Sequence, residues 1–140
     1  MKAVLDHIGI AVSDVGSALA FYCEALGLEL EATEDVGSQR VRAHFIRAGD
    51  VKLELLEATD VGSPVAKFVD KHGPGLHHIT FRVDDIAAAL ERLKAKGVRL
   101  VDERPRPGAE HAVVAFLHPS AAHGVLVELK QNLPVEPRQD

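Results

Sequence analysis

Two histidines and two glutamates occupy matching positions in a repeated pattern, and together they could hold a metal ion. His7 and His78 lie in the similar segments LDHIGIAVSDV and LHHITFRVDDI, while Glu54 and Glu128 lie in KLEL and LVEL. Two neutral imidazoles and two carboxylates suit a divalent transition metal and leave open positions for a chelating substrate. An open catalytic site is therefore expected rather than a closed structural zinc site, which favours cysteine-rich cages.

The repeat extends beyond these residues and indicates an internal duplication. A shift of 71 positions, from 7 to 78, also places Asp14 on Asp85. A long unit present in two copies is typical of a duplicated module with internal two-fold symmetry rather than of an open solenoid. If the first and last strands of each module are neighbours, and the modules pair edge to edge, the four side chains converge.

Periodic patterns of apolar residues predict the elements that must position these side chains. The expected strands cover 4–12, 28–33, 39–48, 51–56, 76–83, 98–102, 111–118 and 124–130, and the expected helices cover 15–26, 63–72 and 84–96. Both modules then read βαβββ, with module one over 4–58, a linker helix segment over 59–75, module two over 76–131 and a loose tail over 132–140. The first helix is expected to pack through an apolar stripe formed by Val15, Leu19, Tyr22 and Leu26.

Composition bounds the class of protein. With 140 residues, 46% of them hydrophobic, the chain can form one ordinary core and thus a single domain. A net charge of −5, no basic run and no tryptophan argue against nucleic-acid binding. The sequence shows no apolar run of membrane-spanning length and no signal-peptide pattern at its start, so a cytoplasmic protein is expected. The single cysteine, Cys23, is expected to be a structural thiol in a reducing compartment.

Several segments resemble a known family. They are DHIGIAV at 6–12, KLELL at 52–56, SPVAKF at 63–68, GLHHI at 75–79, FLHP at 116–119 and GVLVEL at 124–129. Together they resemble the vicinal oxygen chelate superfamily, also called the glyoxalase superfamily, and within it the methylmalonyl-CoA epimerase family, over about residues 4 to 131. The resemblance implies an α+β fold in which two βαβββ modules form an eight-stranded, cup-shaped mixed sheet with helices on the outside.

The same resemblance implies a function and a site. It implies metal ligands at His7, Glu54, His78 and Glu128, the four residues that the repeat selects independently. It also implies a homodimer that acts on an acyl-CoA, with cobalt as the first expectation and zinc, nickel or manganese as alternatives. The implied activity interconverts (R)- and (S)-methylmalonyl-CoA by proton abstraction alpha to the thioester through a metal-stabilised enolate. Glu128 is the expected catalytic base.

Three positions depart from the pattern of that family. Many members carry glutamine where Glu54 stands, some bacterial members carry a glutamate base where Ala43 stands, and a lysine often replaces Ser120. Because Ala43 cannot accept a proton, Glu54 is hypothesised as a second catalytic base that serves the opposite face of the substrate. Its position as the pseudo-symmetric partner of Glu128 motivates this hypothesis.

The sequence is also compatible with other functions and with roles for other residues. A glyoxalase I-like lactoylglutathione lyase shares the ligand set, although HPSAAHG at 118–124 replaces the turn common in such proteins. A metal-free small-molecule-binding protein of the same fold would have discarded the ligands. Arg104 and Arg106 could meet an anionic part of the substrate, or could be solvated loop residues. His77 and His118 could hydrogen-bond near the ligands or simply pack.

Overall fold

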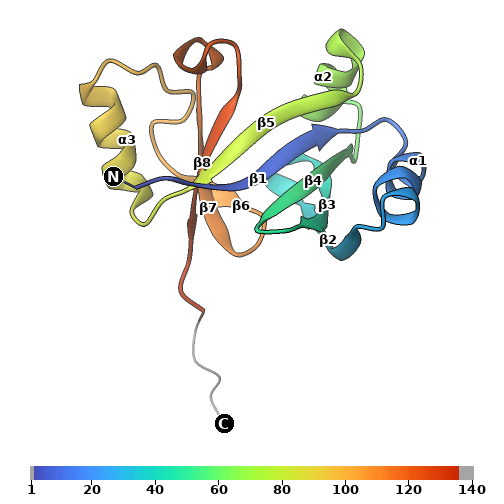
Figure 1. Cartoon of the computed structure of the whole chain (residues 1–140). Coiled ribbons are helices and arrows are strands. Elements are labelled where there is room, and N and C mark those ends of the chain that lie inside the picture. The colour runs from blue at the N-terminus through green and yellow to red at the C-terminus, as the bar shows by residue number, and fades with distance from the viewer. Residues whose placement is uncertain (1, 136–140) are drawn as a thin grey trace.

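The computed structural model describes residues 2–135, which form one curled sheet with three α-helices (Figure 1). The strands are β1 (Val4–Ala11), β2 (Glu29–Val36), β3 (Val41–Ala48), β4 (Val51–Ala58), β5 (Gly75–Arg82), β6 (Arg106–Gly108), β7 (Ala112–Leu117) and β8 (Val127–Asn132). The helices are α1 (Val15–Leu19), α2 (Pro64–His72) and α3 (Ile86–Ala95). No helix among these residues is long and apolar enough to cross a bilayer.

The sheet has eight strands in the order β2-β3-β4-β1-β5-β8-β7-β6, which is symmetrical about the antiparallel pair β1 and β5. The pairs β1–β4 and β5–β8 are parallel and the rest are antiparallel, so the sheet is mixed, as the sequence predicts. Its two edges are tied together, because Ser38 Oγ donates to the Pro107 carbonyl at 3.3 Å and the Glu110 amide donates to Glu34 at 3.0 Å. The strands therefore enclose a concave face.

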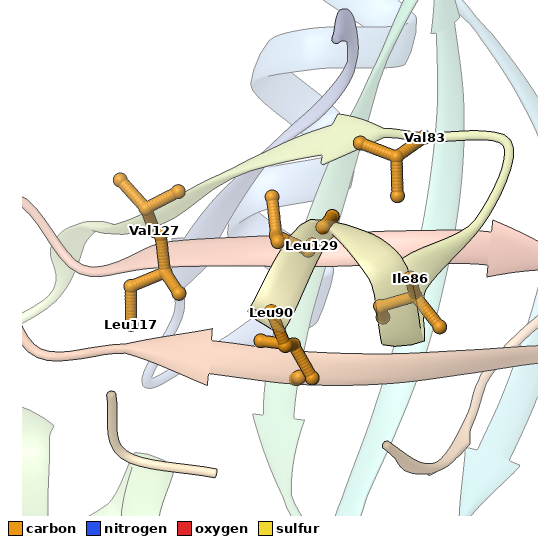
Figure 2. Packing of buried hydrophobic residues seen from close by; sticks show 8 residues of the cluster. Val83, Ile86, Leu90, Leu117, Val127 and Leu129 are labelled. Carbon is orange, nitrogen blue, oxygen red and sulfur yellow. The ribbon is translucent and has the colours of Figure 1, made fainter. Parts of the chain in front are cut away.

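The outer face of the second half carries one of two apolar cores. α3 begins after Asp85, whose side chain accepts a hydrogen bond from the Ala88 amide, as expected of an N-cap residue. The helix lies across β7 and β8, and its Ile86 and Leu90 meet Leu117 and Leu129 (Figure 2). This packing leaves alternate residues of the same strands, Glu128 among them, for the concave face.

The helix α2 differs from the expectation that the helices cover the outside. Its Val65 is buried in a second core with Leu56, Ala11 and Ala43. Leu56 lies two residues from Glu54 on β4, so it shares the concave face with that carboxylate. α2 thus closes one end of the concave face, on the side that carries the expected ligands.

The first helix also differs from its prediction. It is α-helical only over Val15–Leu19 and continues as a π-helical segment over Ala20–Ala25, and neither part buries a residue. Within the predicted stripe, Val15, Leu19 and Tyr22 are only partly buried and Leu26 is 57% exposed, so the stripe adds no fully buried residue to the core. Phe21, outside the stripe, is 53% exposed. An apolar surface on the first half is left open instead.

Several predicted strand boundaries need correction. The segment 98–102 is not a strand: only Leu100 forms an isolated bridge, because the Val101 and Asp102 amides both donate to the Phe116 carbonyl and no ladder develops. The sixth strand, Arg106–Gly108, lies inside the segment 103–110 that was expected to be a loop.

Three other strands run further than the patterns predict, and one of them, β4, continues two residues past the predicted end at 56, to Ala58. β2 continues to Val36, through residues expected to form a turn. β8 covers Val127–Asn132 and so enters the expected tail, of which 136–140 lie outside the described residues.

Candidate active site

The strand register gathers the four predicted ligands on the concave face. Glu54 on β4 and His78 on β5 both lie opposite Gly9 of β1. His7 lies two residues before Gly9 and opposite Thr80, which in turn lies opposite Glu128 of β8. Because directly opposed residues of adjacent strands point to the same face, the four side chains come together at the centre of the sheet.

The four side chains are buried and close to one another. Each is at most 7% exposed. His7, Glu54 and His78 offer ligand atoms within 4.8 Å of one another. Glu128 Oε1 lies outside that group, yet it is 3.6 Å from the Nε2 atoms of both His7 and His78. The geometry thus brings together all four residues that the repeat singles out.

The donor atoms fit a cation. His7 Nε2 and His78 Nε2 are buried and make no hydrogen bond with the described residues, although His7 Nε2 lies 3.0 Å from Glu54 Oε2. Buried polar atoms are almost always paired, so two unpaired imidazole nitrogens beside two carboxylates fit a bound cation. A cavity of about 10 Å³ adjoins His7, Glu54 and Glu128, among other residues. The residues therefore fit a divalent metal ion bound by nitrogen and oxygen.

Neighbouring residues orient both imidazoles. The His7 Nδ1 atom lies 2.7 Å from Asp6 Oδ2 and the His78 Nδ1 atom lies 2.9 Å from His77 Nδ1. A carboxylate or other partner on one ring nitrogen fixes the tautomer and leaves Nε2 for a metal. The Thr80 hydroxyl donates to Glu128 Oε1 at 2.7 Å and so fixes that carboxylate as well.

The charges of these groups shift one another's pKa values. Burial lowers the pKa of His7, but the carboxylates of Asp6, Glu128 and Glu54 outweigh it and raise the value to about 11, so a bound metal ion would have to replace the Nε2 proton. Burial lowers the pKa of His78, and it lowers the pKa of His77 to about 4. Burial raises the pKa of Glu128, but nearby His7 and the Thr80 hydroxyl outweigh it and lower the value, so the carboxylate is held ionised.

A chain of ion pairs lies next to the site. The buried Lys130 ammonium lies 3.2 Å from Asp6 Oδ2 and 2.9 Å from Glu110 Oε1, and Lys52 binds the other oxygen of Glu110 at 3.0 Å. Asp6, His7 and Glu110 could by spacing form a second metal cluster. Lys130 pairs with both carboxylates, Arg82 pairs with Asp6 and Lys52 pairs with Glu110, so cations already compensate their charge and we assign this cluster a supporting role.

The His78 ring lies so close to the backbone of residue 9 that only glycine fits there. A Cβ atom at position 9 would overlap the imidazole ring of His78. We expect Gly9→Ala to displace the ring, to weaken metal binding, and to lower the free energy of unfolding by about 1–3 kcal/mol, as overpacking does. Gly37→Ala is the matched control, because its Cβ would meet no atom within 4 Å. Equal metal affinity and equal denaturation midpoints for the two variants would contradict this prediction.

Two hollows lead away from the ligands. A cavity of about 220 Å³ has His78, Gln39, Arg106 and Phe116 in its wall. A groove of about 760 Å³ between the end of α2 and the start of β8 is lined mostly by apolar groups, Leu76 and Val125 among them. His77, His78 and Leu126 border both the cavity and the groove. A ligand with a small group at one end and a long extended chain could therefore occupy both.

The remaining candidate residues of the sequence differ in where they lie. Arg106 borders the cavity, whereas Arg104 is exposed and makes no hydrogen bond or ion pair within residues 2–135. His118 caps the short helical turn Pro119–Ala122 through its side chain, so it has a structural role. Cys23 is a partly exposed free thiol.

The comparisons with known proteins define the class first. Residues 6–116 match the glyoxalase/bleomycin resistance protein/dioxygenase superfamily, and the chain belongs to that family. Relatives with an assigned activity indicate a narrower group within that family. The chain is 43% identical to an ethylmalonyl-CoA/methylmalonyl-CoA epimerase of Cereibacter sphaeroides over 129 residues, covering 91% of this chain and 96% of the relative.

Solved structures agree with this relationship. The fold matches a methylmalonyl-CoA epimerase of Mycobacterium tuberculosis with a TM-score of 0.87 and 39% identity, covering 93% of this chain and 88% of that one. It matches a methylmalonyl-CoA epimerase in complex with methylmalonyl-CoA and ammonium with a TM-score of 0.89 and 37% identity, covering 99% and 100%. The resemblance and the fold inferred from the sequence are thereby confirmed.

Proposed function

We propose that this protein is an isomerase, a metal-dependent methylmalonyl-CoA epimerase that interconverts the (R) and (S) forms of its substrate. The observation that carries the proposal is the buried set His7, Glu54, His78 and Glu128, with two orphan imidazole nitrogens, in a chain 43% identical to such an epimerase. The same four residues are the proposed metal ligands. Cobalt is the proposed ion, with zinc, nickel or manganese as alternatives that suit the same donors.

The reaction needs a proton to leave one face of the substrate and to return to the other. The acidic carbon lies between a thioester carbonyl and a carboxylate. A bound divalent ion would supply positive charge that stabilises the enolate. The residues of the chain then have to hold the acyl group, exclude water and accept the proton.

Glu128 and Glu54 are the proposed bases. Glu128 is buried and ionised, and the Thr80 hydroxyl binds only one of its oxygens in the described structure. Glu54 approaches the site from β4, on the other side of the β1–β5 pair. Ala43 offers no base, and Glu34, which lies opposite Ala43, accepts the Glu110 amide with both carboxylate oxygens. Glu54 is thus the carboxylate that supports a second base best.

The proposed second base predicts a specific effect of Glu54→Gln. We expect epimerisation to fall about 100-fold, because general-base catalysis contributes roughly 10²–10⁴-fold. Metal content should persist, since an amide oxygen can still ligate the ion. The measurement is turnover together with elemental analysis of the purified variant. If turnover and metal content both match the unaltered protein, another group or a water serves that face.

The assay that tests the proposed function is hydrogen exchange at the substrate. The protein is incubated with one epimer of methylmalonyl-CoA in deuterated water, and loss of the α-proton is followed with the appearance of the other epimer. No exchange by metal-loaded protein would refute the proposal. Turnover of methylglyoxal and glutathione would favour the glyoxalase-like alternative, and metal-free protein that binds a ligand without reaction would favour a binding protein.

Two further properties stay proposals. A homodimer is supported by the open apolar surface on the first half, where Phe21, Leu26 and Leu30 are each at least 40% exposed. Sedimentation of the purified protein tests it, and a monomer at micromolar concentration would contradict it. The cytoplasmic location expected from the sequence is tested by cell fractionation.

A further inference from the structure

The cavity of about 220 Å³ that borders His78 contains one arginine or lysine side chain. Its wall is formed by twelve residues, of which Arg106 is the only arginine or lysine. Of the four ligands His78 belongs to the same wall, so a group bound in this cavity lies beside His78 and faces Arg106. The Arg106 side chain is 42% exposed, which leaves its guanidinium accessible from the cavity.

The guanidinium is held in place but retains free donors. Its Cζ atom lies 5.1 Å from the centroid of the Phe116 ring, and its Nε atom lies 3.3 Å from Asp102 Oδ2. That carboxylate oxygen also accepts the Phe116 amide at 2.9 Å. The Arg106 Nε atom is buried and makes no well-directed hydrogen bond within residues 2–135, and its terminal nitrogens have no acceptor there either. A positioned guanidinium with unused donors is suited to a planar carboxylate.

Phe116 links this cation to the ligand set. Its ring meets Arg106 on one side and meets the His78 ring edge-on, with the two ring centroids 6.1 Å apart. We propose that Arg106 binds the free carboxylate of the acyl group and thereby selects malonyl-type thioesters over thioesters of simple monocarboxylic acids. This inference rests on the proposed function, because it places the acyl group at the four ligands.

The size and lining of the two hollows favour the acyl carboxylate over the phosphates of coenzyme A. The cavity of about 220 Å³ is smaller than the roughly 300–1,000 Å³ that drug-sized ligands occupy, so it admits a small acyl head. The groove of about 760 Å³ reaches that range, but no arginine or lysine lines it. The coenzyme A part of the thioester is therefore assigned to the groove, away from Arg106.

A binding measurement tests the assignment without turnover. Malonyl-CoA and propionyl-CoA are titrated calorimetrically into the metal-loaded protein and into Arg106→Met, with Arg104→Met as the matched control on the same loop. We expect Arg106→Met to weaken malonyl-CoA binding about 10–100-fold, as loss of a charge-assisted hydrogen bond does, with propionyl-CoA binding unchanged. Arg104→Met should alter neither affinity. Arg106→Lys, which keeps the charge and the aliphatic stem over Phe116, should retain part of the preference.

The outcomes separate this inference from the proposed function. Equal weakening of both thioesters by Arg106→Met would place the arginine on the shared coenzyme A arm and overturn the inference. An unchanged preference in both Arg106 variants would overturn it as well. If the unaltered protein prefers malonyl-CoA through Arg106 but exchanges no α-proton of methylmalonyl-CoA, the epimerase proposal fails and the carboxylate site stands.

Discussion

Replacing Glu128 by glutamine is expected to lower the rate of epimerisation about 10³-fold, within the range that general-base catalysis supplies. The Thr80 hydroxyl binds Glu128 Oε1 at 2.7 Å, and an amide oxygen can accept the same hydrogen bond, so the variant should fold. Its amide cannot take up the α-proton. The rate is measured with each epimer separately, by α-proton exchange in deuterated water and by inversion.

If each proposed base serves one epimer, the two glutamine variants should differ in which epimer still exchanges its α-proton. In Glu128→Gln, inversion should fail for both epimers, while exchange without inversion should persist for the epimer whose α-proton faces Glu54. Glu54→Gln should show the reverse preference. Metal content, measured beside each rate, separates loss of a base from loss of the ion. Loss of exchange for both epimers in Glu128→Gln, with metal retained, would leave Glu128 as the only base and contradict a role for Glu54.

The gathering of the four proposed ligands could be predicted from sequence because it depends on local periodicity and on the repeat. His7, His78 and the two glutamates hold equivalent positions in two similar units, and a strand places alternate residues on one face. The two-residue period of a strand could also have identified Thr80 and Lys130. They lie two residues after His78 and Glu128, and both face the site. The position of Asp6, directly before His7, could not be predicted, because adjacent residues of a regular strand point to opposite faces and the register of β1 shifts between Leu5 and His7.

The residues that reach the site from the segment around β6 could not be found in this way. Arg106 and Glu110 reach the site because the sheet curls until the segment around β6 meets the one after β2, through contacts such as Ser38 with Pro107. Such closure depends on the twist of all eight strands and has no local pattern. The short edge strand Arg106–Gly108, with a proline at its centre, also lacks the apolar alternation that predicts a strand.

Replacing His78 by alanine is expected to abolish tight metal binding. Loss of outer partners of a metal ligand alone costs roughly 10–100-fold in affinity, so loss of a ligand should cost at least about 100-fold. His78 is 5% exposed, and no other described histidine besides His7 offers a ligand atom to this cluster. The affinity is measured by titrating cobalt into metal-free protein.

Thermal unfolding gives a second readout of His78→Ala that is independent of activity. A ligand that binds only the folded state stabilises it by about 2.7 kcal/mol at a free concentration 100 times the Kd, so added cobalt should raise the Tm of the unaltered protein. The Tm of His78→Ala should not respond to the same cobalt concentration. His72→Ala, at the exposed end of α2, is the control and should respond as the unaltered protein does. An equal response of all three proteins would show that the ion binds elsewhere, because the orphan Nε2 of His78 would then contribute nothing to its binding.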